Sequence, residues 1–122
     1  MPVPQAFHHV TLSVTDLDAS VRWSERALGL ARVADREGPG WTRVLLRASS
    51  GLTIGLTLHE STDPTDSFDP TMVGLDHLSI ACVDRAEVEA WATHLATVGI
   101  DHSGIDDAPA GHVHVGKDPD GI

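Results

Sequence analysis

The sequence predicts an α+β protein that contains one βαβββ unit written twice. Three observations support this: an internal repeat, an alternating apolar pattern at the start of each copy, and a helical pattern directly after it. When residues 9–16 are laid over residues 77–84, a histidine, an aspartate and the apolar positions between them coincide, and Trp23 falls on Trp91. Such agreement at one fixed offset indicates an internal duplication.

Each half is predicted to open with a strand whose apolar and polar residues alternate. The apolar positions are Val10, Leu12 and Val14 in the first half and Leu78, Ile80 and Cys82 in the second. Successive side chains of a strand point to opposite faces, so the apolar residues of each strand share one face, toward the core. His9 and His77 then occupy the other face.

A helix is predicted after each opening strand. Asp16 and Asp84 are suitable N-caps, because a carboxylate oxygen accepts a hydrogen bond from the free backbone N–H groups of the first turn. Apolar residues recur at helical spacing after both aspartates. Gly29 and Gly99 stand where a left-handed residue ends a helix.

The first half continues with three strand patterns, near residues 30–37, 41–48 and 52–59, separated by glycine-rich turns. The second half has strand patterns near 100–105 and 112–117 and then the turn sequence Asp118-Pro-Asp-Gly121.

The domain organisation follows from these patterns. We expect a first module over residues 1–59, a linker rich in Ser, Thr, Asp and Pro over 60–75, and a second module over 76–122. By symmetry with the first module, the second lacks its last strand. We therefore expect the natural chain to continue past Ile122.

The charge balance excludes two classes of partner. Eight Lys and Arg residues stand against eighteen Asp and Glu residues, for a formal net charge of −10. Nucleic acids and anionic membranes both require clustered positive charge, so neither is an expected partner. The N-terminus has no signal-peptide pattern, no apolar run could span a bilayer, and the single cysteine cannot form an internal disulfide. The sequence predicts a soluble cytoplasmic protein.

Four motifs together resemble the vicinal-oxygen-chelate superfamily, which contains glyoxalases, bleomycin-resistance proteins and extradiol dioxygenases. They are His9-Val-Thr-Leu-Ser-Val-Thr-Asp-Leu-Asp-Ala-Ser20, Ala27-Leu-Gly-Leu30, Gly74-Leu-Asp-His-Leu-Ser79 and Asp118-Pro-Asp-Gly121. The resemblance implies two βαβββ modules whose curled mixed sheets form a concave cleft, usually in a homodimer. In many dimeric members the cleft takes one module from each chain.

The resemblance also implies a divalent-metal site. The family's ligands come from the first strand of each module, which gives His9 and His77, and from the last strand of the second module. That third ligand is usually a glutamate about four residues after the glycine of the Asp-Pro-Asp-Gly turn, a position past Ile122. Glyoxalase I enzymes use a further glutamate at the position of Gly55, so the two-histidine, one-carboxylate pattern is closer to the dioxygenase and fosfomycin-transferase branches. Such an open set suits Fe(II), Mn(II) or Zn(II).

Other polar residues are candidates with an alternative beside each. His112 and His114 share one strand face and either act as acid and base, or replace a ligand, or lie on a solvated edge. Arg43 and Arg47 also share a face and either hold an anionic substrate or are solvated. His59 is a further candidate for substrate binding, with the same alternative. A histidine at a strand start is often structural, which is the alternative for both proposed ligands.

The sequence favours a metal-dependent enzyme that acts on a small oxygen-chelating metabolite, by a dioxygenase-, lyase/isomerase- or thiol-transferase-like reaction. The alternative is a metal-free protein that binds a small molecule in the same cleft, as bleomycin-resistance proteins do. A third alternative is a structural or regulatory module without small-molecule chemistry, which would leave the paired histidines without a role. The fold alone does not choose among these functions.

Overall fold

The computed structural model describes residues 1–108 and 111–122, with the side chains of 1–102 and 116–122. The chain divides into two compact units, unit 1 (Met1–Asp66) and unit 2 (Ser67–Ile122). The boundary between them falls inside the polar segment 60–75.

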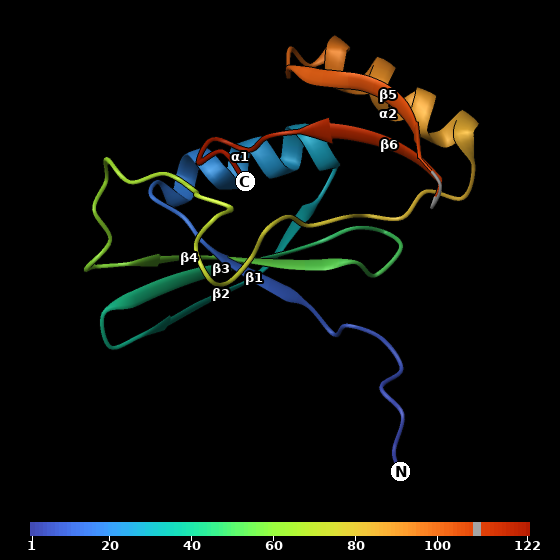
Figure 1. Cartoon of the computed structure of the whole chain (residues 1–122). Coiled ribbons are helices and arrows are strands. Elements are labelled where there is room, and N and C mark those ends of the chain that lie inside the picture. The colour runs from blue at the N-terminus through green and yellow to red at the C-terminus, as the bar shows by residue number, and fades with distance from the viewer. Residues whose placement is uncertain (109–110) are drawn as a thin grey trace. The chain divides into compact units, whose positions relative to one another are not determined.

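Unit 1 has the order β-α-β-β-β that the sequence predicts for the first half (Figure 1). Its elements are β1 (Val10–Ser13), α1 (Leu17–Leu28), β2 (Ala31–Gly38), β3 (Trp41–Arg47) and β4 (Thr53–His59). The four strands form one sheet in the order β1-β4-β3-β2. The pairing of β1 with β4 is parallel and the other two pairings are antiparallel.

Local sequence signals set the ends of α1. Asp16 caps the helix through a 3.0 Å hydrogen bond from the Ala19 backbone N–H to its Oδ1, which satisfies one free donor of the first turn. Gly29 ends the helix in the left-handed conformation, with φ of 64°. Both signals were predicted from the sequence, and both are confirmed.

The core of unit 1 lies between α1 and one face of the sheet. Leu46 is 0% exposed and Val14 1%, and both belong to the apolar cluster. The cluster also contains Val21, Leu30, Val44, Ile54 and Leu56. Because alternate residues of β3 (Val44, Leu46) and of β4 (Ile54, Leu56) join this cluster, the residues between them lie on the opposite face of the sheet.

Unit 2 contains α2 (Arg85–Thr97), β5 (His102–Ala108) and β6 (Gly111–Gly116). Asp84 caps α2 by accepting a 2.9 Å hydrogen bond from the Glu87 backbone N–H, and the Glu87 carboxylate accepts one from the Val83 N–H in return. This reciprocal arrangement is a capping box. β5 and β6 form an antiparallel pair.

The predicted turn at Asp118-Pro-Asp-Gly121 is present in unit 2. The Asp118 Oδ1 accepts hydrogen bonds from the backbone N–H groups of Asp120 at 2.9 Å and Ile122 at 2.8 Å. Gly121 has φ of 89°. Burial raises the pKa of the Asp118 carboxyl, although these backbone donors oppose the shift.

The predicted strand at the start of the second half is wrong. Residues 77–82 are not in a strand, and Leu78 and Ile80 are 38% and 42% exposed instead of facing a core. In unit 1, β1 is held in the sheet by its pairing with β4 alone. Among the described residues of unit 2 no strand corresponds to β4, so this segment has no partner for its backbone hydrogen bonds. The described part of unit 2 is therefore α-β-β and not βαβββ.

No described helix is both long enough and apolar enough to cross a membrane.

Candidate functional site

The face of the unit 1 sheet that points away from the core carries the polar candidates, and we call it the open face. Strand registers assign its residues, because cross-strand neighbours share a face. Arg43 pairs with Thr57 on one side and with Arg36 on the other, and Trp41 pairs with His59. The open face also includes Thr11 and Ser13 of β1, Thr53 and Gly55 of β4, and Leu45 and Arg47 of β3.

Arg43 is held in place by two neighbours on the open face. Its Nε donates a 2.8 Å hydrogen bond to the Oγ1 of Thr57, which is only 1% exposed. Its guanidinium carbon lies 4.5 Å from the centroid of the Trp41 ring, a cation–π distance. Arg47 makes a similar hydrogen bond at an exposed position, where its Nε donates to the Thr53 Oγ1 at 3.1 Å.

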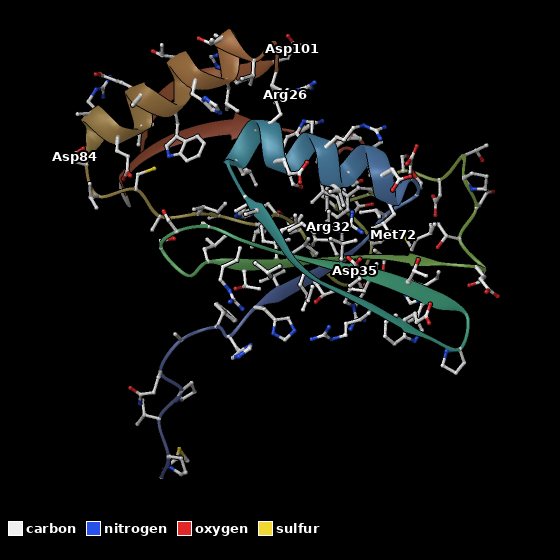
Figure 2. The ribbon with its side chains drawn as sticks, turned by 180° about the vertical axis from the view of Figure 1, so that it is seen from behind. Arg26, Arg32, Asp35, Met72, Asp84 and Asp101 are labelled. Carbon is white, nitrogen blue, oxygen red and sulfur yellow. The ribbon has the colours of Figure 1, made fainter. Side chains whose placement is uncertain are left out.

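The two faces of the sheet differ in how their arginines are neutralised. On β2, Arg32 and Asp35 lie near each other (Figure 2). The Arg32 Nε donates a 2.8 Å hydrogen bond to the Asp35 Oδ1, and this bond raises the pKa of Arg32. Both residues pair in register with core residues of β3, so they do not lie on the open face. Arg36, Arg43 and Arg47 lie on the open face, and none has a carboxylate partner within the described part of the chain.

Thr57 and Trp41 were missed by the sequence reasoning, which considered the arginines but not what holds them. The alternation of Thr53, Gly55 and Thr57 with apolar residues does place these residues on one face. The register that brings Thr57 opposite Arg43 follows only from the folded hairpin.

Gly55, at the position of the further glyoxalase I glutamate, lies on the crowded part of the open face. A Cβ added there would lie 2.8 Å from the Thr11 Oγ1 and 3.2 Å from the Leu45 Cδ2. The Cβ of any larger residue at position 55 would therefore be in close contact with side chains of β1 and β3. A side chain at this position requires Thr11 or Leu45 to shift.

The two proposed metal ligands both have an exposed imidazole with one nitrogen engaged. His9 immediately precedes β1, and its Nδ1 lies 2.8 Å from the Nδ1 of His8. His77, in unit 2, has its Nδ1 2.7 Å from the Asp76 Oδ1. A carboxylate on one ring nitrogen orients the other toward a metal, so the His77–Asp76 pair fits a ligand role. Asp76 was missed by the sequence reasoning, although the Asp-His dipeptide was visible.

The described residues supply only part of the implied ligand set. His9 belongs to unit 1 and His77 to unit 2, and within the described residues no group of three His, Cys, Asp or Glu side chains could hold a metal. His59 lies on the open face beside Trp41. His112 and His114 belong to β6, but their side chains lie outside the described part of the structure.

Comparison with solved structures gives relatives along nearly the whole chain. A glyoxylase/bleomycin resistance protein/dioxygenase domain from Frankia sp. EAN1pec is 30% identical, with a TM-score of 0.88 over 98% of this chain and 88% of that one. A lactoylglutathione lyase from Agrobacterium tumefaciens is 27% identical, with a TM-score of 0.69 over 97% and 89%.

A more distant relative shares the fold alone. The fosfomycin resistance protein FosX from Listeria monocytogenes, solved with Mn(II) and a sulfate ion, is 16% identical, with a TM-score of 0.65 over 98% of this chain and 88% of that one. No curated protein matches the chain.

The family model of the Glyoxalase/Bleomycin resistance protein/Dioxygenase superfamily matches residues 6–122. This confirms the resemblance that the sequence motifs indicated. The chain therefore belongs to the Glyoxalase/Bleomycin resistance protein/Dioxygenase superfamily.

Proposed function

We propose that this chain is a divalent-metal-dependent enzyme acting on a small oxygen-chelating metabolite. The observation that carries the proposal is the pair His9 and His77. They stand at equivalent positions of the duplicated sequence, and each has an exposed ring whose Nδ1 is engaged locally while Nε2 is left for a ligand.

The metal would be Fe(II), Mn(II) or Zn(II). It would be held by His9, by His77 and by a carboxylate that the described residues do not supply. When bound, it would supply Lewis-acid stabilisation to two neighbouring oxygens of the substrate. The relatives support this choice, since they include a lactoylglutathione lyase and a FosX protein solved with Mn(II). A dioxygenase-, lyase/isomerase- or thiol-transferase-like reaction is compatible with such a site. The proposed enzyme is a homodimer whose concave cleft takes one module from each chain.

The remaining candidates take supporting roles in this proposal. His112 and His114 would act as acid and base at the cleft. Arg43, Arg47 and His59 would contact the substrate, since all three lie on the open face.

A metal-free small-molecule-binding protein is the second candidate. It is compatible with the close contacts that a side chain at Gly55 would make with Thr11 and Leu45. This candidate keeps the same cleft and the same open face, but needs no ligand at His9 or His77.

Elemental analysis of the purified protein separates the two candidates. We expect about one equivalent of metal per chain in the wild type, and a clearly lower metal content in His9→Ala and in His77→Ala, because each variant lacks a proposed ligand. His94→Gln is the matched control, because His94 contacts Trp91 on α2 and is no proposed ligand. Equal metal content in all four proteins would remove both histidines from the site, and a metal-free wild type would favour the binding protein.

A further inference from the structure

We infer that the open face of unit 1 binds the oxyanion group of the substrate, with Arg43 as the binding residue and Thr57 and Trp41 as positioning residues. The inference rests on the proposed function, because it names the substrate class of that enzyme: a small molecule that carries a carboxylate or a phosphonate. His9 immediately precedes β1, the strand that brings Thr11 to this face, so the proposed ligand and the open face belong to one unit.

The geometry leaves one edge of the Arg43 guanidinium for a ligand. Its Nε donates a 2.8 Å hydrogen bond to the Thr57 hydroxyl, and its Cζ lies over the Trp41 ring, 4.5 Å from the ring centroid. The N–H groups on the two Nη atoms then remain, and they form the planar fork that matches the two oxygens of a carboxylate or phosphonate.

Thr57 makes this arrangement rigid. It is 1% exposed and sits in the middle of β4, between the β1 and β3 pairings, so its hydroxyl is a fixed acceptor. A solvated arginine loses substantial side-chain entropy when it binds a ligand. Arg43 has lost part of that freedom already, which favours binding over a purely solvated role.

The charge distribution also favours a negative ligand. The chain carries an excess of carboxylates, with a net charge of −10, yet among the described residues of unit 1 no Asp or Glu occupies an open-face position of the sheet. Three arginines share that face, and Arg36 is the direct cross-strand neighbour of Arg43. Like charges directly opposite each other are unfavourable, and an oxyanion between them would relieve the repulsion.

The test is a titration of the full chain, followed through the Nε–H signals of its arginines by nuclear magnetic resonance. The probes are sodium benzoate, phenylphosphonate and, as a neutral control, benzamide. Ionic strength is held constant, because exposed charges respond to salt alone. We expect a saturable shift of the Arg43 signal with at least one anion and none with benzamide.

Matched variants assign the effect to the proposed residues. Arg43→Lys keeps the charge but removes the fork, and should weaken anion binding about 10- to 100-fold, the range for hydrogen bonds to a charged group. Because this variant lacks the Arg43 Nε–H signal, binding in wild type and variants is compared through the backbone amide signals of β3 and β4. Thr57→Val should weaken anion binding. Thr57→Ser keeps the hydroxyl and should bind the anion as the wild type does. Arg22→Gln, on α1, is the control and should leave binding unchanged. Backbone amide spectra of each variant confirm that it is folded.

The outcomes are distinct. Binding of benzoate alone assigns a carboxylate, and binding of phenylphosphonate alone assigns a phosphorus oxyanion. No saturable shift with either anion, or equal loss of binding in Arg22→Gln and Arg43→Lys, overturns the inference. The titration is repeated after EDTA treatment, so that a failure of the metal proposal, seen in elemental analysis, is separate from a failure at Arg43.

Discussion

Replacement of Gly55 by alanine probes the packing of the open face directly. Its added Cβ would lie 2.8 Å from the Thr11 Oγ1, 3.2 Å from the Thr11 Cγ2 and 3.2 Å from the Leu45 Cδ2. Gly55 is not among the glycines with positive φ, so alanine can adopt its backbone conformation. The effect on stability is therefore decided by side-chain contacts.

The expected magnitude follows from three opposing contributions. Alanine in place of glycine in a strand stabilises by about 0.5–1 kcal/mol through the entropy of the unfolded chain. Burial of one methyl group contributes about 0.8 kcal/mol. Overpacking costs about 1–3 kcal/mol, and the 2.8 Å contact with the short, branched Thr11 side chain places this site at the upper end. We expect Gly55→Ala to destabilise unit 1 by about 1 kcal/mol.

A double-mutant cycle with Thr11→Ala isolates the clash. Thr11→Ala removes two of the three nearest atoms, and the third is the flexible end of Leu45. In that background Gly55→Ala should stabilise by about 1 kcal/mol, so the coupling free energy is about 2 kcal/mol. Urea unfolding of the four proteins, followed by circular dichroism, measures it. If Gly55→Ala has the same effect in both backgrounds within about 0.5 kcal/mol, the proposed contact with Thr11 is wrong.

Three further predictions concern single groups. The Ser20 Oγ is buried without a hydrogen-bond partner among the described residues, so Ser20→Ala should raise the free energy of unfolding by about 1 kcal/mol in urea titrations. Asp84→Ala should lower it by about 1 kcal/mol through loss of the α2 N-cap, and an unchanged urea midpoint would contradict this. Burial raises the pKa of Asp118, so its contribution to stability is present at acid pH and lost as the pH rises through that pKa. Asp118→Asn keeps the Oδ1 acceptor. Its melting temperature should exceed that of the wild type at pH 7, and this advantage should disappear below pH 3.8. The reverse order would refute the assignment.

The elements of unit 1 were predictable because their signals are local. Alternation placed the strands to within one or two residues, and the Asp16 cap and Gly29 fixed the helix. The strand predicted at residues 77–82 failed because a strand needs a partner, and alternation alone does not supply one.

The candidate site shows the same division between local and non-local information. Alternation indicated that Arg43 and Arg47 share a face, and the strand registers confirm it. The hydroxyl that holds Arg43 comes from another strand, so it depends on the register of the β3–β4 hairpin. Whether His9 and His77 bind one metal depends on contacts between distant segments, which no local pattern encodes.

The parallel pairing of β1 with β4 has a consequence for biosynthesis. β1 leaves the ribosome before β4, yet its partner in the described sheet is β4, the last strand of the unit. Until Thr53–His59 has been translated, the segment that follows His9 has no template on which to hydrogen-bond. Because pairings between distant segments form slowly, we expect the β2–β3–β4 meander to fold first and the nascent N-terminal strand to dock last. The candidate metal ligand would thus reach its place in the final step of assembling this unit.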